Sequence, residues 1–126
     1  MARTRVLLAE DNADAARVIA ALIDQEPDLV CAGIVASAGE VLGAVEAGGP
    51  DALLLDLQLG DESGIPVLNE CRARFPRLVV VVLSGHDGAT LKKEVRARGA
   101  HDYLVKPNDL EVLVPRLRSA LQESPR

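Results

Sequence analysis

Residues 78–83 read Leu-Val-Val-Val-Val-Leu and are followed directly by Ser84 and Gly85. A strand with one face in water alternates apolar and polar residues, whereas this run is apolar at every position. Three further runs share this character: Val6–Ala9, Ala52–Leu55 and Tyr103–Val105. These runs predict strands of a parallel sheet that is covered on both faces.

The segments between these apolar runs have the residue pattern of helices. A fifth run, Leu29–Val35, is interrupted by small residues and predicts an edge strand. Between the strands, apolar residues recur three or four positions apart, as on the buried face of a helix. In chain order these stripes are Ala15, Val18, Ile19, Leu22 and Ile23; Ala38, Val41, Leu42 and Val45; Leu68, Cys71 and Phe75; Leu91 and Val95, closed by Gly99 as a left-handed cap; and Leu110, Leu113, Leu117 and Leu121. The strict alternation of predicted strands and helices along the chain predicts a doubly wound α/β domain with five parallel strands and five helices.

The last helix carries two opposing signals. Asn108, followed three residues later by Glu111, is typical of a helix start. Pro115 falls inside the periodic stretch, where a proline removes a backbone hydrogen bond. We therefore expect a helix that begins near Asn108 and is kinked at Pro115.

The composition is that of one domain. The chain has 126 residues, 48% of them hydrophobic, with 14 basic and 19 acidic side chains and a net charge of −5. A chain of this size buries roughly two thirds of its surface on folding, so its core needs no disulfide or structural metal. Its two cysteines are too few for a disulfide framework or a zinc site, which favours a reducing, cytoplasmic setting. We expect a single domain over residues 1–126 with no output domain.

Nucleic acid and membrane are disfavoured as direct partners. The net negative charge opposes attraction to a phosphate backbone, and Phe75 and Tyr103 are too few aromatic residues to stack bases. The longest apolar run, Leu78–Leu83, is far shorter than the roughly 20 residues that span a bilayer. The partners are therefore expected to be proteins.

Polar residues follow four of the predicted strands. They are Glu10 and Asp11, Asp56, Ser84 and Lys106. In a doubly wound sheet, ligands bind beyond the carboxyl ends of the strands, where the strand order reverses. If the strand order is 2-1-3-4-5, all of these residues lie in one row at one edge of the sheet.

The acidic end of this row predicts a metal site. Glu10, Asp11 and Asp56 would repel one another unless a cation lay among them. The available ligands are oxygen atoms, with no histidine or cysteine in these positions. Oxygen ligands favour Mg²⁺, with Mn²⁺ as a second suitable ion.

The other end of the row predicts a phosphate site. The Ser84 hydroxyl and the Lys106 ammonium are donors suited to phosphoryl oxygens. Asp56 lies between the two ends, and its carboxylate can attack phosphorus and carry the phosphoryl group as an acyl phosphate. The row therefore predicts phosphoryl capture.

Four blocks of sequence surround these residues, with Asp61 and Gly64 beyond the second. They are Leu-Leu-Ala-Glu-Asp-Asn at 7–12, Leu-Leu-Leu-Asp-Leu-Gln-Leu at 53–59, Val-Val-Leu-Ser-Gly at 81–85 and Asp-Tyr-Leu-Val-Lys-Pro at 102–107. In this order and at these strand ends, the blocks resemble the receiver domain of two-component response regulators. The resemblance covers nearly the whole chain and implies a flavodoxin-like fold with the order 2-1-3-4-5.

The resemblance implies a role for each site residue. Asp56 would accept a phosphoryl group from a histidine kinase or a phosphotransfer protein, and Ser84 and Lys106 would contact that group. Mg²⁺ would be held by Glu10, Asp11, Asp56 and the backbone carbonyl of Gln58. The activity would be self-phosphorylation and slow self-dephosphorylation, so the protein would not be an enzyme with an external substrate.

The resemblance also implies a switch. Ser84 would move toward the phosphoryl group and Tyr103 would turn inward, which would change the face made by the fourth helix, the last strand and the fifth helix. A downstream protein would bind that face, and a homodimer is an option. Three departures stand out. Ser84 stands where threonine is also common, and Gly60 replaces a frequent proline, which should loosen the loop after Asp56. A kink at Pro115 would alter the surface through which such domains dimerise or bind targets.

Three alternatives compete with this interpretation. A degenerate receiver would act as a phosphorylation-independent protein-binding scaffold. A phosphohydrolase with an aspartate nucleophile needs a second carboxylate two residues later, where this chain has Gln58. A nucleotide-binding module needs a glycine-rich loop after the first strand, where Glu10 and Asp11 would repel a phosphate. The scaffold is the alternative that remains.

Overall fold

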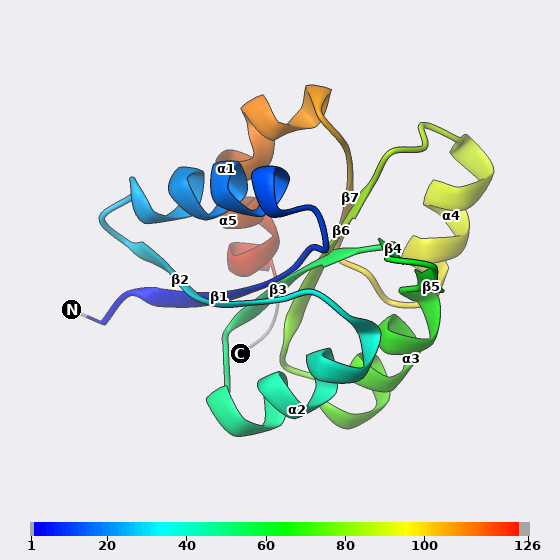
Figure 1. The fold of residues 1–126 in the computed structure, drawn as a ribbon, viewed down its shortest axis with the longest axis horizontal. Helices are drawn as coiled ribbons and strands as arrows, with labels where there is room; N and C mark the ends of the chain where they lie inside the picture. The colour runs from blue at the N-terminus through cyan, green and yellow to red at the C-terminus, as the bar shows by residue number, and fades with distance from the viewer. Residues whose placement is uncertain (1, 124–126) are drawn as a thin grey trace.

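Five parallel strands form the central sheet in the order β2-β1-β3-β6-β7. A computed structural model describes residues 2–123 of the chain, and Figure 1 shows its sheet between two layers of helices. The five strands are β1 (Thr4–Ala9), β2 (Leu29–Val35), β3 (Ala52–Asp56), β6 (Val79–Ser84) and β7 (Asp102–Val105). The predicted parallel sheet, its order and its edge strand at Leu29–Val35 are confirmed.

The helices cover the two faces of the sheet unequally. Helices α1 (Ala13–Asp24) and α5 (Leu113–Glu123) pack on one face, and α2 (Ala38–Gly48), α3 (Ile65–Arg74) and α4 (Ala89–Ala97) pack on the other (Figure 1). Each face has its own buried apolar cluster. Alternate residues of the strands point to opposite clusters, as with Leu53 and Leu54, which is why these strands are apolar at every position.

The structure differs from the prediction at one position of α1 and in one additional pair of strands. Val18 belongs to the apolar stripe of α1 by spacing, but it is 52% exposed and faces away from the core. A short antiparallel hairpin, β4 (Gln58–Leu59) and β5 (Glu62–Ser63), follows Asp56 and was not predicted. No helix among residues 2–123 combines the length and apolar character needed to cross a bilayer.

The predictions for the last helix were wrong. Residues Asn108–Val112 form a separate 3₁₀ helix, η1, and α5 begins only at Leu113. Asn108 therefore does not start α5. Pro115 lies in the first turn of α5, where a backbone N–H has no partner within the helix, so the proline fits there without interrupting it.

The Gly99 cap is confirmed. Gly99 has a φ of +103°, and a Cβ at this position would lie 2.9 Å from the Nε atom of Arg72. The Arg72 guanidinium in turn donates to the backbone carbonyl of Leu78 at 2.9 Å. The close packing of Arg72 on Gly99 ties the end of α4 to the start of β6.

The strand register places the predicted site residues level with one another. Asp56 pairs with Leu83, directly before Ser84, and Ser84 pairs with Val105, directly before Lys106. The carboxyl ends of β3, β6 and β7 therefore meet at one edge of the sheet. This edge is where the sequence predicts phosphoryl chemistry.

His101 is half-buried and lies directly before β7, at the end of the strand opposite Lys106. Its Nδ1 atom accepts a hydrogen bond from the backbone N–H of Val80 at 3.1 Å, which requires an unprotonated nitrogen. Burial, together with the nearby positive charge of Arg72, lowers the pKa of His101 below 6.5.

We expect this histidine to make folding stability depend on pH. Because its pKa is lower in the folded protein, the unfolded chain binds more protons below about pH 6.5, so the free energy of unfolding falls as the pH drops. Urea unfolding from pH 7.5 to 5.5 should show this loss. It should disappear in His101→Gln and persist in His86→Gln, since His86 lies in an exposed loop. If the free energy of unfolding depended on pH equally in the two variants, His101 would not be the cause.

Candidate functional site

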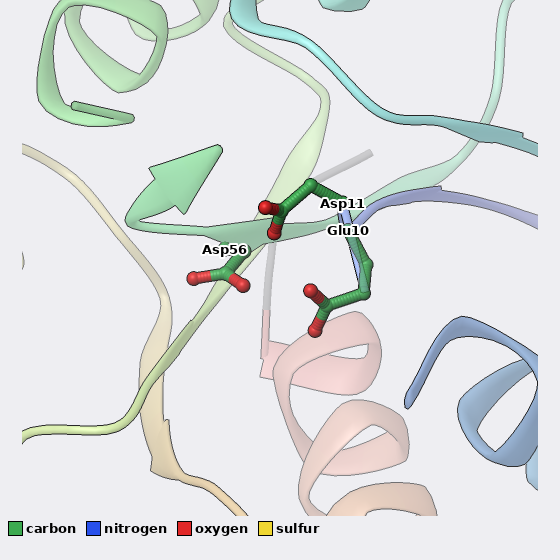
Figure 2. A group of neighbouring side chains, drawn as sticks. All are labelled: Glu10, Asp11 and Asp56. Atoms are coloured by element: carbon green, nitrogen blue, oxygen red, sulfur yellow. The ribbon is translucent and has the colours of Figure 1, made fainter. Parts of the chain in front are cut away.

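Three carboxylates gather at the carboxyl ends of β1 and β3. Each of Glu10, Asp11 and Asp56 offers an oxygen atom, and these atoms lie within 4.8 Å of one another. Figure 2 shows the three side chains directed toward a common space. Glu10 and Asp56 are buried, whereas Asp11 is exposed. The predicted acidic cluster is therefore present.

Lys106 reaches across from the end of β7 to two of these carboxylates. Its Nζ atom lies 2.6 Å from Glu10 Oε1 and 2.7 Å from Asp56 Oδ2. Burial alone would lower the pKa of Lys106, but the two carboxylates outweigh burial and raise the pKa. The lysine therefore stays charged and offsets part of the repulsion within the cluster.

Burial also affects the pKa of Glu10. Burial raises its pKa, the ammonium of Lys106 and the backbone N–H of Asn12 oppose the rise, and neighbouring Asp56 adds to it. The net effect is a raised pKa. A cation nearby would therefore stabilise the charged form of Glu10.

The hairpin after Asp56 holds one carboxylate oxygen of Asp56 and one of Asp11. The backbone N–H of Gln58 donates to Asp56 Oδ1 at 3.0 Å, and the backbone N–H of Gly60 donates to Asp11 Oδ2 at 2.9 Å. Gly60 has a φ of +66°, in the left-handed region that favours glycine. A proline at Gly60 would have neither this N–H nor this backbone conformation. Gly60 therefore anchors Asp11, in contrast to the loosening that its sequence suggests.

Gly64 lies against the backbone of Asp56. A Cβ at Gly64 would lie 2.6 Å from the carbonyl oxygen of Asp56 and 3.0 Å from the Cα of Leu57. The Gly64 N–H donates to the carbonyl of Leu57 at 2.7 Å. This contact brings the start of α3 close to Asp56. Sequence reasoning marked Gly64 as part of the motif but gave it no role.

The backbone of His86 connects Ser84 to Tyr103. The His86 N–H donates to Ser84 Oγ at 3.1 Å, and the Tyr103 hydroxyl donates to the His86 carbonyl at 2.6 Å. Tyr103 is 2% exposed, so it already points inward in this structure. The two predicted switch residues are therefore linked through one loop residue.

A pocket of about 500 Å³ opens above the cluster. Its polar lining includes Glu10, Asp11, Asp56, Ser84 and Lys106, together with Gln58 and His86. Its apolar lining is made by Leu57, Ile65 and Leu91, which sequence reasoning did not connect with the site. A second hollow of about 510 Å³, at the amino ends of β3 and β6, holds none of the predicted site residues. We assign the site to the first pocket because it contains the converging charges.

A second polar cluster joins α4, β7 and α5. The buried Asp102 carboxylate accepts hydrogen bonds from Arg116 at 2.6 Å and from Arg96 at 3.0 Å. Burial alone would raise the pKa of Asp102, but Arg116 and the N–H of Tyr103 outweigh it, and the pKa is lowered. Lys92 of α4 lies 5.9 Å from the centre of the Tyr103 ring. The predicted output face is thus connected to Tyr103 by charged contacts.

Comparison with known proteins points to one family. The family model for the response regulator receiver domain matches residues 6–118. The chain is 32% identical over 124 residues to the uncharacterized transcriptional regulatory protein YkoG of Bacillus subtilis, covering 98% of this chain and 54% of YkoG. It is 32% identical over 120 residues to the cell cycle transcriptional regulator CtrA of Caulobacter vibrioides, covering 95% of this chain and 51% of CtrA. The chain thus spans about half the length of these relatives.

A solved structure agrees with these relatives. The response regulator domain of Thermotoga maritima CheB superposes with a TM-score of 0.88 at 25% identity, covering 98% of this chain and 99% of that domain. The fold and the sequence motifs therefore lead to the same group of proteins.

Proposed function

Because this chain belongs to the response regulator receiver domain family of two-component systems, we propose that it accepts a phosphoryl group on Asp56 and signals through a changed protein-binding surface. The surroundings of Asp56 are the main support for this proposal. Asp56 is buried at the floor of a pocket, 2.7 Å from the Lys106 ammonium and beside two further carboxylates. This arrangement suits a carboxylate nucleophile with a cation on either side of it.

The donor set fits a magnesium ion. Glu10, Asp11 and Asp56 supply hard oxygen atoms, and this group of residues contains no histidine or cysteine. We assign the ion to these three side chains and to the Gln58 carbonyl, with Mn²⁺ as a substitute. When bound, the ion neutralises charge on the phosphoryl oxygens.

The protein groups perform the transfer as follows. An Asp56 oxygen attacks phosphorus, the bond from phosphorus to the donor breaks, and its electron pair leaves with the donor. The Lys106 ammonium and the Ser84 hydroxyl donate hydrogen bonds to the phosphoryl oxygens. Slow hydrolysis of the acyl phosphate returns the protein to its starting state.

We assign the donor to a histidine kinase or a histidine phosphotransfer protein, since receiver domains pair with such proteins. The downstream protein, or a second copy of this chain, would bind the face of α4, β7 and α5. The contacts from Ser84 through His86 to Tyr103, and from Tyr103 to Lys92, support this choice. The competing function is a scaffold whose surface does not respond to phosphorylation.

Beryllofluoride, which mimics an acyl phosphate on a carboxylate, tests the switch. We expect Mg²⁺ with beryllofluoride to shift the amide NMR signals of α4 and β7, including that of Tyr103, in addition to those of the pocket. Asp56→Asn should show no such shifts. Changes confined to the pocket, or equal in the variant, would favour the scaffold.

A further inference from the structure

The second hollow lies at the opposite end of β3 from Asp56. Its volume is about 510 Å³, within the range of roughly 300–1,000 Å³ that is usual for small-molecule sites in proteins. It opens where α2 and α3 end and where the chain enters β3 and β6. Its apolar lining is made by Val45, Pro50, Phe75, Pro76 and Leu78. The hollow can therefore hold an apolar group at a distance from the phosphoryl chemistry.

Phe75 contributes an aromatic ring to this lining. The ring is half-buried, and the guanidinium of Arg74 lies 5.2 Å from its centre. Arg74 is in turn paired with Glu46 at 3.1 Å. These contacts favour one position of the ring, and a ring in a fixed position packs well against a second ring in an offset or edge-on arrangement. The lining therefore suits a ligand with an aromatic group.

Two side chains of opposite charge, Asp51 and Arg77, also line the hollow. Ala52 pairs with Val79, so both charged residues lie just before the paired ends of neighbouring strands, which are about 5 Å apart. The Asp51 carboxylate is held by the backbone N–H of Arg5, which donates to Oδ2 at 2.8 Å. Within residues 2–123, no carboxylate lies within ion-pair distance of the Arg77 guanidinium. The hollow thus presents one anion and one cation that are not paired with each other.

These two charges select a ligand that carries both signs. A ligand with a carboxylate alone would be attracted by Arg77 and repelled by Asp51, and a ligand with an amine alone would meet the reverse. A free α-amino acid carries its ammonium and its carboxylate on one carbon atom. Its two charges complement two side chains at neighbouring strand ends, and its net charge of zero adds no uncompensated charge.

We propose that the hollow at the amino ends of β3 and β6 binds a free α-amino acid with an aromatic side chain. The carboxylate of the ligand pairs with the Arg77 guanidinium, which can donate two parallel hydrogen bonds, and its ammonium pairs with the Asp51 carboxylate. Its ring packs against Phe75 and the neighbouring prolines. Because Asp56 lies at the other end of β3, this binding requires neither Asp56 nor Mg²⁺.

L-Tryptophan is a direct probe of the site because the chain contains no tryptophan. We would titrate the protein, without Mg²⁺, into a low concentration of L-tryptophan and follow the fluorescence anisotropy of the indole. Two derivatives separate the charges: N-acetyl-L-tryptophan lacks the ammonium, and L-tryptophanamide lacks the carboxylate. The variants are Arg77→Gln and Asp51→Asn. Their matched controls are Arg17→Gln and Asp14→Asn, which change an exposed ion pair of α1 on the other face of the sheet.

The charge dependence of binding is the readout. We expect the wild type to bind L-tryptophan about five-fold more tightly than either derivative. Arg77→Gln should weaken binding of L-tryptophan about five-fold and change that of L-tryptophanamide less than about two-fold, because the amide has no carboxylate to lose. Asp51→Asn should do the same for L-tryptophan and N-acetyl-L-tryptophan, and asparagine can still accept from the Arg5 N–H. Both α1 controls should bind as the wild type does.

The location of binding gives a second readout. We expect L-tryptophan to shift the amide NMR signals of Gly49, Asp51 and Leu78, and to bind Asp56→Asn as tightly as the wild type. If a variant of the hollow fails to fold by circular dichroism, the three ligands on the wild type still give the test. No saturable binding of L-tryptophan, equal binding of all three ligands, or shifts confined to the pocket above Asp56 would each overturn the proposal. These outcomes leave the acceptor role of Asp56 untouched, because that role is measured by phosphorylation.

Discussion

Replacing Lys106 with glutamine is expected to slow phosphorylation of Asp56 about a hundred-fold. The ammonium lies 2.7 Å from Asp56 and 2.6 Å from Glu10, where it can stabilise charge that develops on the phosphoryl oxygens. Removal of one such preorganised donor typically costs about 10²–10³ in rate. The rate constant with acetyl phosphate and saturating Mg²⁺, followed by intact mass, measures the loss.

The same variant should bind Mg²⁺ about ten-fold more tightly, because a positive charge that competes for the carboxylates is removed. Isothermal titration calorimetry measures this affinity. The matched control is Lys93→Gln, an exposed lysine of α4, which should change neither quantity. A Lys106→Gln protein that is phosphorylated at the wild-type rate would refute the role given to this lysine.

Substitution of Gly64 by alanine is expected to lower the free energy of unfolding by about 2 kcal/mol. The added Cβ would lie 2.6 Å from the Asp56 carbonyl oxygen, so the backbone of either β3 or α3 must move. The φ of −81° at Gly64 is open to alanine, so the cost comes from the clash. The displaced Asp56 should also bind Mg²⁺ with beryllofluoride at least ten-fold more weakly.

Gly43→Ala provides the control for Gly64→Ala. Gly43 lies inside α2, and a Cβ there would meet nothing within 4 Å. Alanine should therefore stabilise the protein by about 0.5–1 kcal/mol through its higher helix propensity. Urea unfolding compares the two variants. Equal stability of Gly64→Ala and the wild type would show that the close approach at Asp56 is not needed.

Much of the fold was predictable because its strands are buried on both faces. The run at 78–83 is apolar at every position, and its register with β3 and β7 brings Asp56, Ser84 and Lys106 to one edge. Parallel strands place their carboxyl ends together, so residues that follow the strands meet there even though they are distant in sequence. The acidic cluster followed from the same rule.

Other features depend on contacts that a linear pattern does not encode. Spacing places Val18 on the apolar stripe of α1, but whether a position faces the core depends on how the helix packs. The Pro115 prediction failed because the periodic pattern continues from η1 into α5 and conceals the boundary between them. The contact of Gly64 with Asp56 and the sharing of Lys106 by two carboxylates arise only from the folded arrangement.

The most direct test of the central claim is the intact mass of the protein after incubation with acetyl phosphate. We expect one added phosphoryl group in the wild type and in Asp61→Asn, which changes an exposed carboxylate five residues away. We expect none in Asp56→Asn, and none in the wild type when a chelator removes Mg²⁺. A phosphoryl group that still appears in Asp56→Asn, or one that never appears in the wild type, would contradict Asp56 as the phosphoacceptor.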